Sequence, residues 1–148
     1  MKYIAVNKSN INLLYKLNKK LASCEKQSSL FVAKKEDYKR AFICKNPVVF
    51  GVLIYKKDKV AGFIIYSYKF ATYLASKVVY IEDIYFKKRF QTDDNIKKAI
   101  LHMIKIAKKK SYARVEIRVL NEYGVDKRTL KGLKFQKIKK WDVYRYEV

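Results

Sequence analysis

Residues 78–86 read Val-Val-Tyr-Ile-Glu-Asp-Ile-Tyr-Phe, and this stretch decides the fold. Seven of its nine residues are apolar or aromatic, which is typical of a central strand that is covered on both faces. Neighbouring side chains of a strand point to opposite faces, so we expect that Glu82 and Asp83 cannot both reach water on one side. An unpaired carboxylate in a dry core costs several kcal/mol. Each carboxylate therefore needs a charged partner or a water-filled cleft, and we predict a functional site here.

The segments around this strand predict further strands and helices. Expected strands carry apolar and aromatic runs and lie at 2–6, 48–55, 60–68, 114–120, 135–138 and 141–148. Expected helices carry apolar residues three and four apart and lie from Ser9 or Asn10 to near Cys24, at 34–43, at 94–110 and at 124–131. The order β-α-α-β-β-β-α-β-α-β-β predicts a single α/β (α+β) domain over residues 1–148. It would contain one mixed, mostly antiparallel sheet with helices on both faces.

Positive charge dominates the composition. The net charge is +22, from 35 basic and 13 acidic residues, an excess that is typical of proteins that bind nucleic acid. Only six of the basic residues are arginine, the residue that makes most base contacts and bidentate phosphate contacts. The lysines are spread along the whole chain without a basic tail. We therefore rank nucleic-acid binding third among the functions and interpret the charge as a solvated surface that favours anionic ligands.

Few residues are of the types that form metal sites or nucleophilic triads. With one histidine, His102, and two distant cysteines, Cys24 and Cys44, no metal site and no Ser/His/Asp or Cys/His set can be assembled from spacing. His102 is expected to pack at the edge of a helix. No stretch approaches the roughly 18 apolar residues of a membrane span, and the first residues have too short an apolar run for a signal peptide. We expect a cytoplasmic protein with reduced thiols and no membrane partner.

Two strands carry a resemblance to a known family. Residues 60–68 read Val-Ala-Gly-Phe-Ile-Ile-Tyr-Ser-Tyr, and residues 80–86 read Tyr-Ile-Glu-Asp-Ile-Tyr-Phe. Together with the order of elements and Asn121-Glu122, they resemble the GNAT superfamily of N-acetyltransferases, and within it the diamine and polyamine (spermidine/spermine) enzymes. The resemblance implies transfer of acetyl from acetyl-CoA to a primary amine, either a polyamine-like small molecule or a protein amine. A homodimer is compatible with this resemblance.

The resemblance also implies where acetyl-CoA would bind. The cofactor is expected between residues 78–86 and 114–120, which splay apart in the family. Its pyrophosphate would lie at the N-terminus of the helix 94–110, where free N–H groups and the helix dipole attract an anion. The expected cofactor-binding residues are the backbone of Ile84, Tyr85 and Phe86, the loop of Gln91, Thr92, Asp93, Asp94, Asn95 and Ile96, and Asn121.

The cofactor loop departs from the family pattern. In the same register, Asp94 and Ile96 stand where the family has glycines, which allow the backbone to approach phosphate closely. Asp93 and Asp94 also add negative charge where a pyrophosphate would lie, and like charges repel more strongly where water is excluded. This departure keeps a second hypothesis open: a GNAT-fold binding module that has lost acetyl-CoA and catalysis.

Three residues are the expected catalytic groups. Glu82 and Asp83 match the carboxylates that face the amine in the family, where they bind or deprotonate it; the alternative is an ion pair with lysines such as Lys77. Arg128 stands where the polyamine enzymes have a tyrosine that protonates the leaving thiolate, and Tyr123 lies five residues earlier. Arginine does not release its proton, so Arg128 is expected to stabilise a thiolate by charge.

Overall fold

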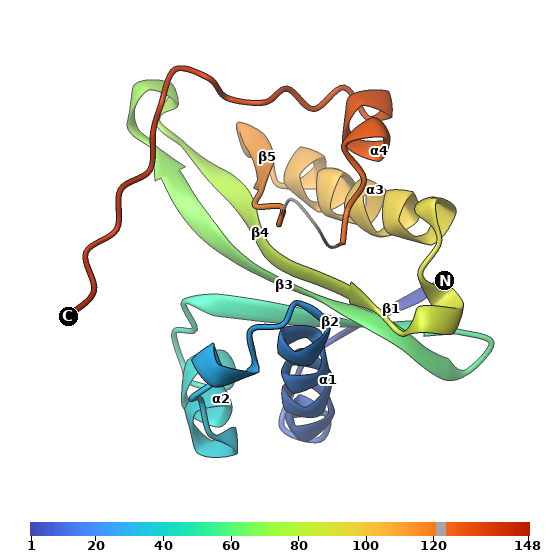
Figure 1. Cartoon of the computed structure of the whole chain (residues 1–148). Helices are drawn as coiled ribbons and strands as arrows, with labels where there is room; N and C mark the ends of the chain where they lie inside the picture. Colours follow the sequence, from blue (N-terminus) through green and yellow to red (C-terminus); the bar gives the residue numbers. More distant parts are fainter. Residues whose placement is uncertain (121–123) are drawn as a thin grey trace.

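The computed structural model describes residues 1–120 and 124–148 and contains a five-stranded sheet with helices on both faces (Figure 1). The strands are Lys2–Ala5 (β1), Val49–Lys56 (β2), Lys59–Ala71 (β3), Ser76–Phe86 (β4) and Arg114–Ile117 (β5). The helices are Ile11–Cys24 (α1), Lys35–Phe42 (α2), Asp93–Lys109 (α3) and Lys127–Gly132 (α4). Strands follow the order β1-β2-β3-β4-β5, antiparallel except for the parallel pair β4–β5. The predicted α+β class is confirmed.

Helices α1 and α2 cover one face of the sheet (Figure 1). The buried side chains of α1 recur every three or four residues, as one helical face requires. They are Ile11, Leu14, Leu17 and Leu21. They pack against Leu53 and Phe63 of the sheet, and burial of each such side chain contributes about 1.5–3 kcal/mol. This packing holds α1 against the strands that carry the expected site.

Helix α3 covers the opposite face (Figure 1). Ile100 and Met103 are fully buried against Val79 and Ile81 of β4. The ring of His102 stacks on that of Tyr3, with centroids 3.8 Å apart and planes 3° apart. The expectation that His102 is a packing residue is thus confirmed.

The antiparallel hairpins depend on special backbone positions. Lys57 and Asp58 turn β2 into β3 with φ values of 47° and 58°, the left-handed pair that tight hairpins prefer. Gly62 allows β3 and β4 to approach closely: a Cβ at this position would lie 2.0 Å from the carbonyl oxygen of Tyr85. Any side chain there would force the strands apart, just where β4 carries the expected cofactor edge.

Two predicted strands do not form, and a third is shorter than expected. Residues 135–138 and 141–148 have no regular secondary structure, and aromatic side chains such as Trp141 and Tyr144 are exposed, at 72% and 90%. The predicted final hairpin is therefore wrong. An alternating pattern forms a strand only where the edge of a neighbouring strand accepts its backbone hydrogen bonds. The strand expected at 114–120 is shorter than predicted, because β5 ends at Ile117.

Candidate functional site

Strand β4 is longer than its partner β5. Their register ends where Ile81 faces Ile117, but β4 continues to Phe86. These last residues still pair with β3 on their other side, where Phe86 faces Gly62. Backbone groups of a strand alternate between its two edges, so part of this segment faces away from β3 without a β5 residue opposite. Within the described residues β5 ends short of this segment, so an extended, amide-bearing arm could add to this edge as a strand does.

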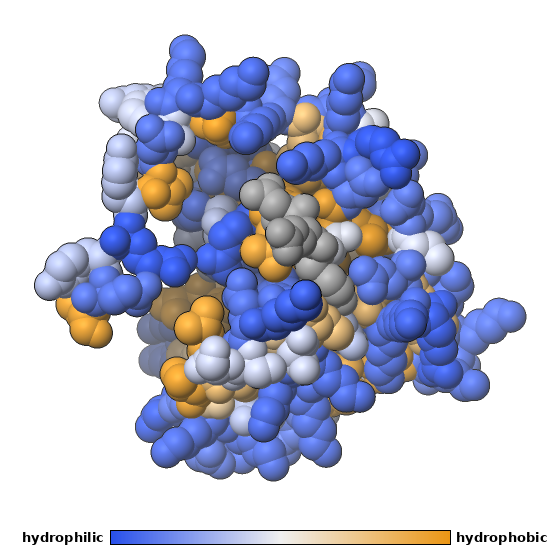
Figure 2. Space-filling view, viewed as in Figure 1, coloured by the Kyte–Doolittle hydropathy of each residue, from blue (hydrophilic) through white to orange (hydrophobic). Residues whose placement is uncertain are grey.

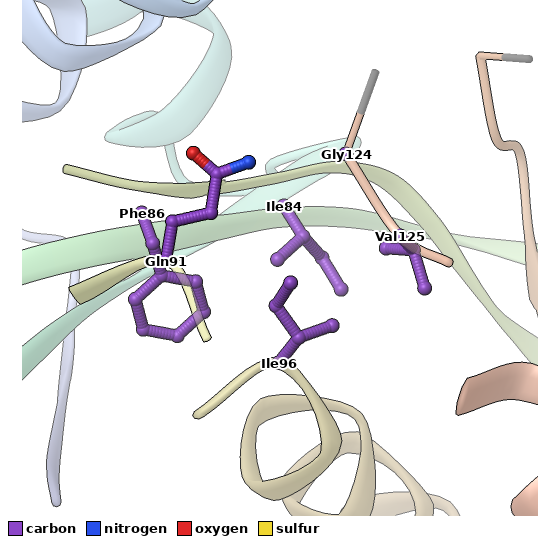
Figure 3. Close-up of a pocket in the computed structure, with 6 residues that line it drawn as sticks. All are labelled: Ile84, Phe86, Gln91, Ile96, Gly124 and Val125. Atoms are coloured by element: carbon purple, nitrogen blue, oxygen red, sulfur yellow. The ribbon is translucent and has the colours of Figure 1, made fainter. Parts of the chain in front are cut away.

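Apolar side chains close the space beside this edge (Figure 3). Ile84 of β4 points toward Ile96 of the first turn of α3, with Val125 beside them (Figure 3). The remaining cavity measures about 10 Å³, which is no more than one water requires. Phe86 and Gln91 line its other end. An arm paired with β4 would therefore need the segment at Val125 to shift.

The two adjacent carboxylates lie at an irregularity of β4. Ile65 of β3 faces Asp83 while Tyr66 faces Ile81, so Glu82 has no partner and forms a β-bulge. The bulge breaks the alternation of side chains, and the prediction that the two carboxylates point strictly to opposite faces is wrong. Glu82 accepts a hydrogen bond from Ser67 Oγ at 3.1 Å and lies 3.9 Å from the guanidinium of Arg118.

Asp83 lies between β4 and the two N-terminal helices. Asn18 of α1 lies close enough to Asp83 to lower its pKa, and Asn18 Nδ2 donates to the hydroxyl of Tyr38 at 2.7 Å. Burial raises the pKa of Asp83 above its ordinary value, the charge of Glu82 adds to this rise, and Arg118 and Asn18 oppose it. A carboxylate with a raised pKa is a stronger base, so Asp83 is better suited to accept a proton than an ordinary aspartate.

A third carboxylate joins this cluster from α1. Glu25, at the C-terminal end of α1, is half-buried. Its pKa is raised by burial and then by the charge of Asp83, and lowered by Arg118. Glu25, Glu82 and Asp83 thus share Arg118 as their nearby cation, and the cluster is a negative region in a protein of net charge +22. Such a region attracts a cationic ligand.

Sequence reasoning missed the partners of the carboxylates. Arg118, not Lys77, is the cation beside them; Lys77 Nζ lies 5.6 Å from the ring centroid of Tyr68. Asn18 carried a usable signal, because it is a polar residue beside the buried Leu17 and Leu21 of one amphipathic helix. No feature of the neighbouring sequence marked Glu25 or Arg118 as a member of this carboxylate cluster.

The loop before α3 is held by its own side chains. Thr92 Oγ1 caps the helix by accepting from the Asn95 backbone N–H at 3.2 Å. Asn95 is 2% exposed and donates to the Phe90 carbonyl at 2.7 Å. Asp94 is exposed and pairs with Lys98 at 2.7 Å, while Asp93 is exposed beside it. Asn95 and Ile96 are therefore structural residues of this turn.

Arg128 lies apart from the carboxylate cluster. Its guanidinium binds Asp126 at the start of α4, at 2.8 Å, and it is close enough to Asp93 for the two charges to interact. It is thus placed near the N-terminus of α3. Asn121 and Tyr123, the other residues expected in this region, lie outside the described residues.

A comparison to protein families agrees with the fold. The model of the Acetyltransferase (GNAT) family matches residues 13–125, which include β4, β5 and α3. The chain belongs to the GNAT family. A comparison with curated proteins finds no match to this GNAT chain.

Solved structures of several acetyltransferases share the fold. An aminoglycoside acetyltransferase from an uncultured soil metagenomic sample, in complex with sisomicin, has a TM-score of 0.74 and 13% identity, with 99% of this chain and 95% of that chain covered. Ribosomal-protein-alanine N-acetyltransferase from Brucella melitensis biovar Abortus 2308 has a TM-score of 0.78 at 12% identity, covering 99% and 98%. A predicted acetyltransferase from Clostridium acetobutylicum with acetyl-CoA has a TM-score of 0.74 at 12% identity, covering 97% and 95%. At these identities the likeness concerns the fold.

Acetyl-CoA is the cofactor that GNAT proteins normally use. The residues present fit its amide-bearing arm better than they fit its pyrophosphate. The edge of β4 beyond β5 suits the amide-bearing arm once the segment at Val125 shifts. At the other end, the N-terminus of α3 offers a favourable dipole, but Asp93 and Asp94 place carboxylates in its first turn. Lys56 and Lys97 lie close enough to Asp94 to lower its pKa, after Lys98, so cations partly offset that charge.

Within residues 1–120 and 124–148, no helix combines the length and the apolar character needed to cross a bilayer. In the same described part of the chain, no three His, Cys, Asp or Glu side chains gather where they could hold a metal ion.

Proposed function

We propose that this GNAT protein is an N-acetyltransferase that transfers acetyl from acetyl-CoA to a cationic primary amine. One observation carries the proposal. The β4 segment that extends past the end of β5 at residues 84–86 also carries Asp83, a half-buried carboxyl with a raised pKa. A single strand therefore presents both an edge for the cofactor arm and a base for the amine.

The carboxylate cluster fits the acceptor. A primary amine is a cation at neutral pH, so Glu25, Glu82 and Asp83 would attract it. The nitrogen attacks only when it is neutral, and Asp83 would take its proton, directly or through water, and hold it on the carboxyl oxygen. Acetyl-CoA, when bound, supplies the thioester carbonyl. Arg128 would contribute positive charge near the start of α3 without donating a proton.

The class of acceptor is proposed as a small polyamine-like molecule or a protein amine. The polyamine alternative comes from the similarity of residues 60–68 and 80–86 to the spermidine/spermine enzymes. Two structural neighbours are named for amine acceptors, an aminoglycoside acetyltransferase and a ribosomal-protein-alanine acetyltransferase. Both fit an acidic acceptor cluster.

Cofactor titration tests the first half of the proposal. CoA and acetyl-CoA are added while the unfolding temperature or the heat of binding is measured. A real site predicts stabilisation of about 2.7 kcal/mol at a hundredfold excess over Kd. Absence of any shift at millimolar cofactor would contradict the enzyme and leave the alternative, a GNAT-fold binding module, which the Thr92 cap and the exposed Asp94 favour.

Substitution of Asp83 tests the second half. Asp83→Asn should keep CoA binding but lower kcat/KM for the amine by about 10²–10⁴-fold, as expected for a lost general base. Glu116→Gln is the matched control, because Glu116 pairs with Lys69 and Arg114 on the surface and should leave kcat/KM unchanged. Equal rates in the wild type and Asp83→Asn would remove Asp83 from the mechanism. Nucleic-acid binding is the third candidate function. It predicts an affinity for double-stranded nucleic acid that falls steeply as the salt concentration rises.

A further inference from the structure

A groove lies on the side of α1 that is turned away from the sheet. It measures about 410 Å³ and is lined by Tyr15, Lys16, Lys19, Lys20, Ser28 and Phe31. This volume falls within the roughly 300–1,000 Å³ typical of small-molecule sites. The buried face of α1, centred on Leu14 and Leu17, is opposite to this lysine row on a helical projection. The groove is therefore separate from the carboxylate cluster, which α1 meets through Asn18.

One wall of the groove is positively charged. Lys16, Lys19 and Lys20 have the spacing i, i+3, i+4 and so lie on one side of the helix, with neighbouring Cβ atoms about 5–6 Å apart. All three are exposed. In the part of the chain that the structure describes, no acidic residue lines the groove and no ion pair engages these lysines. Their charge is therefore free to bind an anion with more than one charged group.

The floor of the groove is aromatic and held in place. Tyr15 and Phe31 lie with ring centroids 5.7 Å apart. Tyr15 packs edge-on against Tyr38 at 5.2 Å and donates its hydroxyl to the Ala33 carbonyl at 3.3 Å. Both rings are half-buried. The two ring planes are inclined by 57°, so each ring offers its own apolar face on which another ring can stack.

We propose that this groove binds a nucleoside polyphosphate, with the phosphates on the lysine row and the base on the Tyr15–Phe31 floor. Each half of the groove matches one half of such a ligand. An inorganic polyphosphate would use the lysines alone, and an uncharged nucleoside would use the rings alone. This proposal does not depend on acetyl transfer, because the groove shares no residue with the β4 edge or the carboxylates.

Calorimetric titration of the full chain with ATP tests the ligand class. ATP should bind at least tenfold more tightly than either adenosine or tripolyphosphate, since each of these lacks one half of the contacts. Equal affinity for ATP and tripolyphosphate would overturn the aromatic part of the proposal. Absence of heat with millimolar ATP would overturn it entirely.

Two charge-matched triple variants locate the site. Lys16→Glu/Lys19→Glu/Lys20→Glu should weaken ATP binding at least tenfold. Lys105→Glu/Lys108→Glu/Lys109→Glu has the same spacing on exposed positions of α3 and the same change in net charge, and should alter the affinity by less than threefold. Equal losses in both variants would show that binding follows net charge alone and would overturn the site. Far-UV circular dichroism checks that both variants fold.

Two further measurements separate the groove from the proposed cofactor site. Phe31→Leu should weaken ATP binding and leave tripolyphosphate binding unchanged, because only the base contacts the ring. Pantetheine, which carries the amide arm of CoA without its adenine nucleotide, should not displace ATP from the groove. Displacement of ATP by pantetheine would place ATP at the β4 edge and overturn the assignment, whereas failure of pantetheine to bind at all would count against the cofactor site only.

Discussion

At the residue scale, the ionised carboxylate of Asp83 lowers the stability of the folded protein. Burial raises its pKa in the folded protein, while in the unfolded chain the pKa is about 3.9. The folded state therefore binds the proton more tightly, and stability falls as the pH rises through the window from the unfolded pKa to the raised folded pKa. Above that window the folded protein keeps the full loss of stability that ionised Asp83 causes.

Replacement of Asp83 should remove this loss of stability. Asp83→Asn is expected to raise the unfolding temperature at about pH 7, and the difference from wild type should vanish near about pH 3, where both carry no charge at residue 83. Thermal unfolding at a series of pH values measures this. Glu25→Gln should act in the same direction, because burial also raises the pKa of Glu25. An Asp83→Asn protein that is less stable at about pH 7 would show that the favourable interactions of ionised Asp83 with Arg118 and Asn18 outweigh desolvation.

Asp94 is the residue at which the cofactor loop can be tested. Asp94→Gly removes a carboxylate from the first turn of α3 and should tighten CoA binding, by about tenfold if one repulsion of about 1.4 kcal/mol is removed. Asp94→Asn is the control that removes charge but keeps the side chain, so it separates charge from bulk. Binding calorimetry measures both variants. Weaker binding by Asp94→Gly would show that Asp94 does not occupy the position of the family's first glycine.

At the element scale, the contact between β3 and β4 depends on Gly62. Gly62→Ala would place a methyl group 2.0 Å from the Tyr85 carbonyl oxygen, so the strands must separate, with a loss of stability of about 1–3 kcal/mol or more. Gly132→Ala, at the end of α4, meets no atom within 4 Å and should be neutral or stabilising by up to about 1 kcal/mol. Urea unfolding compares the two, and equal stability of both variants would contradict the close approach of β3 and β4.

At the scale of the whole molecule, the charge of +22 opposes the compact state. The described ion pairs are surface pairs whose basic partner is half exposed or more, and such pairs contribute little. The surface is mainly hydrophilic on the face shown in Figure 2, including the region of α1 and α2. Self-repulsion of this surface is therefore poorly compensated.

Salt should stabilise the protein. Raising NaCl from about 0.01 M to 0.1 M shortens the Debye length from about 30 Å to about 10 Å, which screens repulsion across the molecule and should raise the unfolding temperature. The control is the Lys105→Glu/Lys108→Glu/Lys109→Glu variant, whose three charge reversals lower the net charge by about six and which should respond less to salt. An unfolding temperature that falls with salt would show that attractive pairs dominate.

The sequence by itself determined the local elements of this protein. The spacing of Ile11, Leu14 and Leu17 and the apolar run at 78–86 predicted α1 and β4 within a few residues, because helical and strand periodicity are properties of consecutive side chains. The resemblance in residues 60–68 and 80–86 also led to the GNAT family, which the match over residues 13–125 confirmed.

Only the tertiary structure decided how those elements meet. The bulge at Glu82 depends on the register with β3. The meeting of Glu25, Asp83 and Arg118 joins α1, β4 and the chain after β5, and the free edge of β4 depends on where β5 ends. The alternating pattern at 141–148 predicted a strand that has no partner. Register, pairing and burial arise between distant segments, so they follow from the packing of the whole chain and not from any one stretch of it.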